Sequence, residues 1–121
     1  MAVDVPTTRQ AFAAALAELM PATAELTIRN EAELGDAAAI HCMWPLEEKG
    51  PYSGNYSREI TARISAATIN AFRAADGQSR GVMLDRFKSV CAVRLAEGGY
   101  NEQDPSSPAF LIHIDEHSLE S

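Results

Sequence analysis

The chain has 121 residues, a formal net charge of −7, 46% hydrophobic and 22% charged residues, a composition that suits one domain with one core. The acidic charge argues against nucleic-acid binding, because phosphate contacts need clustered lysine and arginine, and no apolar run approaches the roughly 18 residues of a membrane span. We expect a single domain over residues 1–121 with short flexible ends, about 1–5 and 117–121, and neither a nucleic-acid nor a membrane partner.

The first residues, MAVDVPTTRQAF, predict a cytoplasmic location. They contain no basic region, and Asp4, Thr7 and Arg9 soon interrupt the apolar residues, so we do not expect a secretory signal. The thiols of Cys42 and Cys91 should then be reduced. Because neither cysteine belongs to a CxxC motif or a Cys/His cluster, both are interpreted as small buried apolar groups.

The first three predicted elements are a helix and two strands. Thr7 and Gln10 form a capping-box pattern, apolar residues at three- and four-residue spacing follow, and Pro21 ends the helix. The segments ELTIRN and AAIHCMW alternate apolar with other side chains, which is typical of half-buried strands. Their closeness in sequence predicts a hairpin.

The second half of the chain is predicted to hold a loop, a helix and two more strands. Residues 47–57 are loop-like in composition, and an apolar stripe predicts a helix from about Arg58 to Ala75. Residues 86–96 fit a helix or a strand. A strand is favoured, because the alternation would put these mostly apolar side chains on one face: Phe87, Ser89, Cys91, Val93 and Leu95. The last strand is AFLIHID, with its isoleucines facing inward.

The predicted fold class is α+β, in the element order α-β-β-α-β-β. Neither helix can bury its apolar stripe alone, so both should cover one face of a four-stranded antiparallel sheet, a two-layer sandwich. The other face should stay uncovered and hold a mixture of apolar and charged side chains: Thr27, Arg29, Ala39, His41, Met43, Lys88, Val90, Ala92, Arg94, Leu111 and His113.

The segment FLIHIDEH contains two of the three histidines and suggests a metal site. Side chains two apart on a strand share a face, so His113, Asp115 and His117 would line up, and His41 would join them if its strand were a neighbour. Imidazole and carboxylate suit zinc. The spacing of about 6.5–7 Å along a strand is wide for one ion, however, and a solvated strand face is the alternative interpretation.

Catalytic motifs are otherwise missing from the sequence. It contains no GxSxG, P-loop or dinucleotide fingerprint. Cys42 and His41 would point to opposite faces of a strand, which separates a nucleophile from its base. We therefore lean against an enzyme and expect no cofactor, and we keep as an alternative a small metal- or ligand-binding enzyme centred on His41, His113 and Asp115.

Basic side chains concentrate in the middle of the chain: Arg58, Arg63, Arg73, Arg80, Arg86, Lys88 and Arg94. We interpret them as a solvated helix face and strand edge paired with the acidic flanks. A surface that binds anions or an acidic partner is the alternative, although no aromatic residues of a binding platform are interleaved with them.

The uncovered sheet face suggests a contact surface for a protein partner or a second copy. Its candidate contacts, together with aromatic residues near it, are Met43, Trp44, Tyr52, Tyr56 and Leu111. Trp44 equally suits the core, and the tyrosines suit loop packing. The predicted function is therefore a cytoplasmic, non-enzymatic protein-interaction or adaptor domain.

The stretch AAAIHCMWPLEEKGPYSGNYSREITARIS, with the acidic, alanine-rich ends, resembles a small beta-proteobacterial domain family of unknown function. The resemblance covers most of the chain in general layout, and it implies neither an activity nor site residues. A looser similarity is to the acidic chaperones of type III secretion, which implies a small cytoplasmic dimer as a second alternative. The predicted elements lack that family's third consecutive strand and its closing C-terminal helix.

Overall fold

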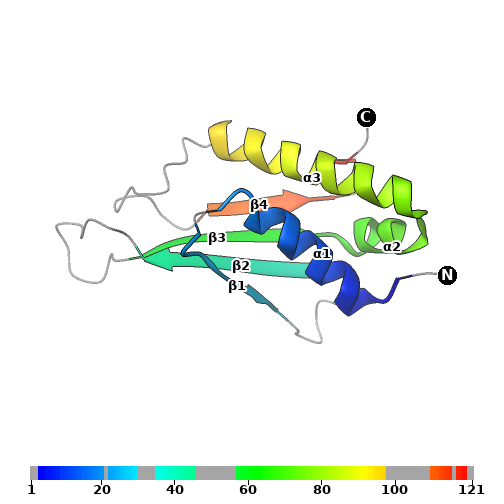
Figure 1. Cartoon of the computed structure of the whole chain (residues 1–121), viewed down its shortest axis with the longest axis horizontal. Coiled ribbons are helices and arrows are strands. Elements are labelled where there is room, and N and C mark those ends of the chain that lie inside the picture. The colour runs from blue at the N-terminus through cyan, green and yellow to red at the C-terminus, as the bar shows by residue number, and fades with distance from the viewer. Residues whose placement is uncertain are drawn as a thin grey trace.

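The computed structural model describes residues 3–20, 22–29, 35–45, 57–97, 110–115 and 117–119. Its elements, in chain order, are α1 (Val5–Ala17), β1 (Glu25–Ile28), β2 (Ala38–Pro45), β3 (Ser57–Ile64), α2 (Ala66–Ala74), α3 (Gly77–Glu97) and β4 (Phe110–Ile114). The strands lie in the order β1-β2-β3-β4, with β3 and β4 parallel and the other pairs antiparallel (Figure 1). The prediction of an α+β chain with four strands is confirmed, whereas the predicted element order and wholly antiparallel sheet are wrong.

The first helix forms where the sequence predicts it, but with a different cap. Asp4 is the N-cap, and its Oδ1 accepts a hydrogen bond of 2.7 Å from the backbone N–H of Thr7. The capping-box prediction for Thr7 is therefore wrong. The helix ends at Ala17, earlier than the predicted stop at Pro21.

β3 occupies the first part of the predicted second helix. Ile60, Ala62 and Ile64 are buried in alternation with Glu59, Thr61 and Arg63, which face away from the core. The helical prediction fails because Ile60 and Ile64 are four residues apart, a spacing that suits one face of a helix and one face of a strand alike. The strand also supplies the third consecutive strand that the predicted elements lacked.

The helical part of that segment starts later, as α2. Ser65 caps it by accepting a hydrogen bond of 3.2 Å from the N–H of Thr68. Ile69 and Phe72 are buried.

α3 runs through the segment predicted as a strand over 86–96, so that prediction is wrong. Phe87, Cys91 and Leu95 are buried at four-residue spacing, whereas Val93, which a strand would bury beside them, is 54% exposed. Asp76 stabilises the start of α3, because its Oδ1 accepts a 2.7 Å hydrogen bond from the N–H of Ser79. This long helix lies between β3 and β4 in the chain, and such a crossover is what a parallel pair requires.

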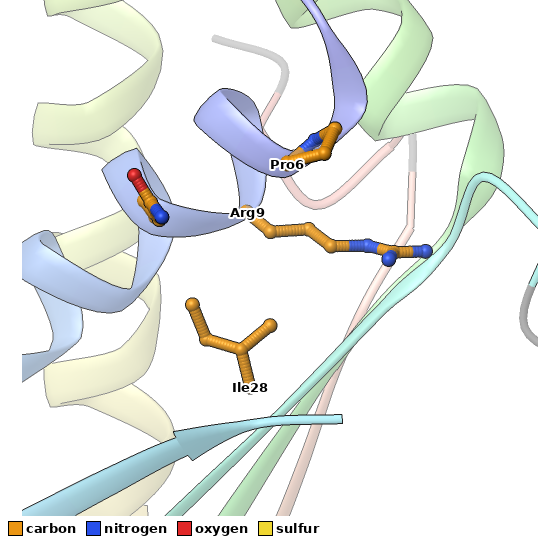
Figure 2. Close-up of a pocket in the computed structure, with 4 residues that line it drawn as sticks. Pro6, Arg9 and Ile28 are labelled. Carbon is orange, nitrogen blue, oxygen red and sulfur yellow. The ribbon is translucent and has the colours of Figure 1, made fainter. Parts of the chain in front are cut away.

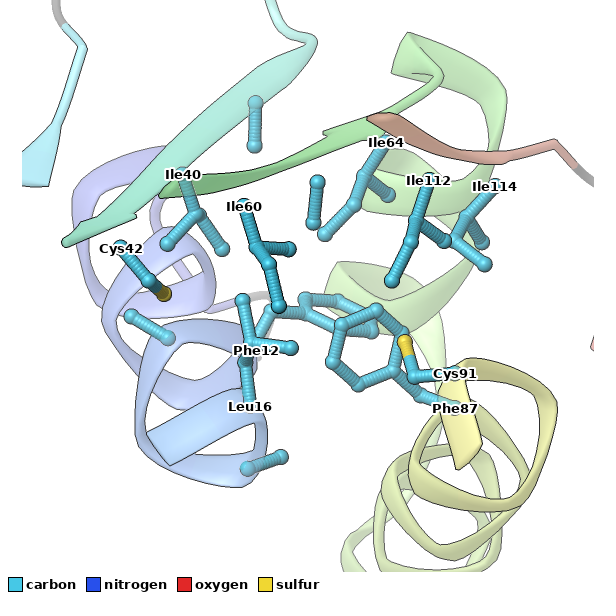
Figure 3. Packing of buried hydrophobic residues seen from close by; sticks show 14 of the residues in the cluster. Phe12, Leu16, Ile40, Cys42, Ile60, Ile64, Phe87, Cys91, Ile112 and Ile114 are labelled. Atoms are coloured by element: carbon cyan, nitrogen blue, oxygen red, sulfur yellow. The ribbon is translucent and has the colours of Figure 1, made fainter. Parts of the chain in front are cut away.

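The core lies between the helices and a single face of the sheet (Figure 3). Phe12 of α1 is fully buried, and its ring centroid lies 5.2 Å from that of Phe72 in α2 and 5.0 Å from that of Phe87 in α3. These rings meet an apolar layer from the strands: Ile40, Cys42, Ile60, Ile64, Ile112 and Ile114. Among the described elements, none packs against the other face of the sheet.

A buried arginine joins α1 to the start of β2. Arg9 donates from Nε and Nη2 to the carbonyl oxygen of Ala37, at 3.0 and 2.6 Å, and from Nη2 to that of Gly35 at 2.8 Å. Figure 2 shows its side chain extending from α1 toward the turn before β2, beside Pro6 and Ile28. Gly35 has a φ of +57°, a left-handed conformation that favours glycine. The arginine thus holds this turn against the helix.

Replacing Phe12 by alanine tests the packing of the three helices. Because Phe12 contacts Phe72 and Phe87 at full burial, we expect Phe12→Ala to lower the free energy of unfolding by about 3–5 kcal/mol in urea denaturation. Val93→Ala on the exposed side of α3 is the control and should change it by about 0.5 kcal/mol or less. A loss below about 1 kcal/mol for Phe12→Ala would contradict this packing.

The caps Asp4 and Asp76 should make the helices sensitive to acid. Hydrogen bonds from the side chain and backbone of Thr7 lower the pKa of Asp4 from its ordinary 3.8, and the backbone N–H of Ser79 is the largest cause of the same lowering at Asp76. Since the folded pKa lies below the unfolded one, this stabilisation is complete above the unfolded pKa and is lost as pH falls through the folded pKa. Asparagine caps a helix without titrating.

We therefore expect Asp4→Asn/Asp76→Asn to match the unchanged chain in Tm at pH 7 and to lose less Tm below about pH 4. Thermal unfolding followed by circular dichroism across this range measures both. Parallel losses of Tm in acid for the two proteins would show that these caps do not contribute to the pH dependence.

Candidate functional site

The open face is the face of the sheet opposite the helices, and it receives side chains from every strand. Among the residues whose side chains the structure describes, the strand register places these on it: Glu25, Thr27, Ala39, His41, Met43, Glu59, Thr61, Arg63, Leu111 and His113. Arg29 follows β1 and donates its backbone N–H to the carbonyl of Ala39 at 2.9 Å. The strand contacts predicted for Lys88, Val90, Ala92 and Arg94 are wrong, because these residues belong to α3.

Exposed apolar side chains lie among the polar ones on this face. Leu111 is 62% exposed and Met43 is 38% exposed. Ala39, in contrast, is buried, although no described element covers it. It lies beside Arg63 in the register, and long charged side chains cover small neighbours with their aliphatic stems. The surface therefore alternates between prominent and recessed positions.

Charges on the open face separate into rows across the strands. Met43 pairs with Glu25 on one side and with Glu59 on the other, which gives an acidic row. Ala39 pairs with Arg63, and Arg63 pairs in turn with His113; the charges of this row are those of Arg63 and of Arg29, which follows β1, so it is called the basic row. A neutral row lies between them: Thr27, His41, Thr61 and Leu111. The sign of the charge thus reverses over about 13 Å along β3.

Arg63 differs from the other basic side chains of the middle segment. Lys88 forms an ion pair of 3.2 Å with Glu18. Four arginines donate to backbone carbonyls. Arg73 donates to the carbonyl of Val3, and Arg80 donates to those of Phe72 and Arg73. Arg86 donates to the carbonyl of Leu119 and Arg94 to that of His113. Among the described residues, Arg63 has neither a hydrogen bond nor an ion pair. Among the described basic side chains, Lys88 thus pairs with an acidic flank as the sequence analysis expects, the four arginines bond to carbonyl groups instead, and Arg63 does neither.

His41 contacts a carboxylate on the neighbouring strand. Its Nε2 lies 3.8 Å from Oε2 of Glu59, and both side chains are partly exposed. An exposed pair of this kind contributes at most about 1 kcal/mol, and only when the imidazole is protonated. The contact links the neutral row to the acidic row.

The four predicted metal ligands are not brought together. β3 separates the strands of His41 and His113, which puts them about 10 Å apart across the sheet, too far for ligands that each lie about 2 Å from one ion. The Oδ1 of Asp115 accepts hydrogen bonds from the N–H of His117 at 2.9 Å and from the N–H and Oγ of Ser118 at 3.0 and 3.1 Å. These bonds, that from His117 foremost, lower the pKa of Asp115. In the part of the chain that the structure describes, no three His, Cys, Asp or Glu residues form a metal-binding group.

The predicted partner contacts have mixed positions. Met43 and Leu111 lie on the open face, whereas Trp44 is 1% exposed and belongs to the core, so it is unavailable as a surface contact. Tyr52 and Tyr56 lie outside the described residues. The sequence pattern places Arg63 only among the basic side chains, and it does not bring Glu59, Thr61 and Arg63 together on the open face, because it predicts a helix where β3 lies. The strict alternation in SREITARI was the signal that identifies them.

The described residues also line hollows outside the open face. One, of about 210 Å³, lies between α1 and β1 and is lined by Pro6, Arg9, Gln10 and Ile28. The Arg9 guanidinium is already bonded to backbone carbonyls. Another, of about 320 Å³, lies along the end of α3. It is lined by Ser89, Val90, Val93, Arg94, Glu97 and Ser118. None of the described helices is long and apolar enough to cross a membrane.

The cysteines lie in the core, and their thiols should react slowly. Burial raises the pKa of Cys42 to about 11 and that of Cys91 to about 12. At pH 8 these values reduce the thiolate fraction at least about a hundredfold relative to an ordinary thiol. We expect a chromogenic disulfide reagent to label the native protein at least that much more slowly than the chain in denaturant. Native labelling at the rate of free cysteine would contradict this burial.

Comparisons of this chain with protein-family models, with curated proteins and with solved structures gave no match. Its function is therefore argued from the open face and from the chemistry of the groups around it.

Proposed function

We propose that this protein is a non-enzymatic protein-interaction domain that binds its partner through the open face. The observation that carries the proposal is the exposure of Leu111 and Met43 on a sheet whose other face is covered by helices. Removing such side chains from water is favourable, at about 25 cal/mol for each Å² of apolar surface. Met43 and Leu111 lie in different rows on strands that β3 separates, so the proposal rests on two apolar contact points set among polar side chains.

Arg63 adds a specific polar anchor to this surface. It is exposed, it lies on β3, which has a neighbouring strand on each side, and it has no partner among the described residues. Arginine is enriched in protein interfaces, because its planar guanidinium binds carboxylates in a fixed geometry. A partner that places a carboxylate over Arg63 and a cation over Glu59 matches the charge rows.

The positions of the candidate metal ligands and thiols also favour an interaction role over an enzymatic one. The candidate ligands His41 and His113 lie on strands separated by β3, and Asp115 is engaged in a turn. Burial keeps both thiols protonated. The metal-dependent alternative therefore has no supporting geometry among the described residues, and we do not pursue it.

Site-specific photo-crosslinking tests the proposal. A benzophenone amino acid replaces Leu111 on the open face or, as the matched control, Val93 on the outer side of α3; both are exposed apolar positions. In cells that produce the chain, we expect covalent protein adducts from position 111 at a yield at least about tenfold above that from position 93, because the proposal places the partner on the open face.

The Arg63→Glu substitution makes this test specific for the charged surface. It should lower the adduct yield at position 111 about tenfold, because it puts a like charge where the partner presents a carboxylate. Equal yields from positions 111 and 93, or a yield at 111 that Arg63→Glu leaves unchanged, would contradict the proposed function.

A further inference from the structure

We infer that the partner is a second copy of this chain, bound open face to open face about a two-fold axis that crosses the strands along the neutral row. This inference rests on the proposed function and names its partner. The observation behind it is the arrangement of the charge rows, which is complementary to itself. The acidic row with Met43 and the basic row with Ala39 lie on either side of the neutral row.

The direction of the axis follows from these charges. Two identical faces can meet about a two-fold axis that lies between them and runs either along or across the strands. An axis along the strands would put the acidic row over its own copy, with Glu59 near Glu59. An axis across the strands reverses the second sheet end for end, so that each acidic row meets a basic row. Opposite charges therefore select the axis across the strands.

Specific contacts follow from this axis. Each strand lies over its own copy in the reversed direction, so Arg63 meets Glu59 of the second copy, and the reverse contact forms at the same time. Met43 lies over the Ala39 position of the second copy, where it meets the aliphatic stem of the Arg63 that covers this alanine. Leu111, in the neutral row, approaches the Leu111 of the second copy and supplies the main apolar contact.

Arg63 and Glu59 do not contact each other inside one chain; Glu59 instead lies 3.8 Å from Nε2 of His41. Arg63 and Glu59 stand four residues apart on the same strand, which separates them by about 13 Å. Sheets that pack face to face lie about 10 Å apart with their strands crossing at about −30°. Long side chains on the inner strand β3 can therefore meet across the axis. The crossing angle between the two sheets displaces these side chains less than those on the edge strands.

The size of the face predicts a weak dimer. Four strands about 4.8 Å apart and about five residues long cover a flat area of roughly 300 Å². A standard interface buries about 800 Å² on each partner. We therefore expect dissociation in the micromolar range or above, with monomer and dimer in equilibrium at the concentrations used in solution studies.

A charge exchange within β3 tests the inference. Sedimentation velocity over about 1 µM to 1 mM should show a monomer–dimer equilibrium for the unchanged chain. Arg63→Glu and Glu59→Arg should each weaken it at least about tenfold, because each puts two pairs of like charges across the axis. The double variant Arg63→Glu/Glu59→Arg should restore the affinity to within about threefold. Because the two residues do not touch within one chain, a rescue can arise only between copies.

Three results would overturn the inference. They are a strict monomer throughout the concentration range, a dimer that both single variants leave intact, and a double variant as weak as the singles. Circular dichroism and Tm establish that each variant is folded. Arg63→Gln and Glu59→Gln, which remove charge without reversing it, serve if a reversal prevents folding, and each should weaken the dimer by a smaller factor.

The photo-adducts separate this inference from the proposed function. A second copy gives an adduct of twice the chain's 13.1 kDa, detected by mass spectrometry. An adduct of another mass that is specific to position 111 and sensitive to Arg63→Glu, together with a strict monomer in solution, refutes the second copy and leaves the proposed function standing. The absence of any adduct specific to position 111 refutes both.

Discussion

The packing of three phenylalanine rings determines the arrangement of this molecule. Phe12 stands between Phe72 and Phe87, and through these rings α1, α2 and α3 share one apolar layer with a single face of the sheet. Aromatic pairs at about 5 Å contribute roughly 0.5–1.5 kcal/mol beyond the area that they bury. Because all described helices are gathered there, the other face is left to water, and its side chains are available for a different use.

The arginines of the middle segment follow from the same arrangement. Helices that lie on one side leave carbonyl groups at their ends and at the chain termini, and buried or partly buried carbonyls require donors. Arg80, for example, donates to the carbonyls of Phe72 and Arg73 at the end of α2. Arg63 projects from the sheet on the opposite side and has no such role. The concentration of basic residues in the sequence is thus largely a property of the helical layer, and one member of it belongs to the open face.

The sequence predicts the strands in which the alternation of apolar side chains is recognised. Leu26 and Ile28 alternate in β1, as do Ile40 and Cys42 in β2 and Ile112 and Ile114 in β4, and this alternation predicts the faces of Met43 and Leu111. Elsewhere the pattern is ambiguous. Ile60 and Ile64 in β3, like Phe87 and Cys91 in α3, are four residues apart, and that spacing satisfies both a strand and a helix.

The candidate site inherits this ambiguity. The pattern predicts a helix where β3 lies and a strand where the second half of α3 lies. The predicted number of strands is therefore correct, although one strand is predicted in the wrong segment. Arg63 and Glu59, which carry the charge pattern of the open face, therefore remained hidden. The contact of Asp115 with Ser118, which fixes Oδ1 of Asp115 in a turn, depends on backbone geometry that no spacing rule contains.

The central claim is that the helices shield one face of the sheet and leave the other accessible until a partner covers it. Oxidation of methionine by dilute peroxide tests it directly, because Met43 lies on the open face and Met20 is 9% exposed in the helix-covered core. Peptide mass spectrometry should show rapid oxidation of Met43 in dilute protein, slower oxidation of Met43 as the protein is concentrated, and protection of Met20 throughout. Equal protection of the two methionines in dilute protein would contradict the account.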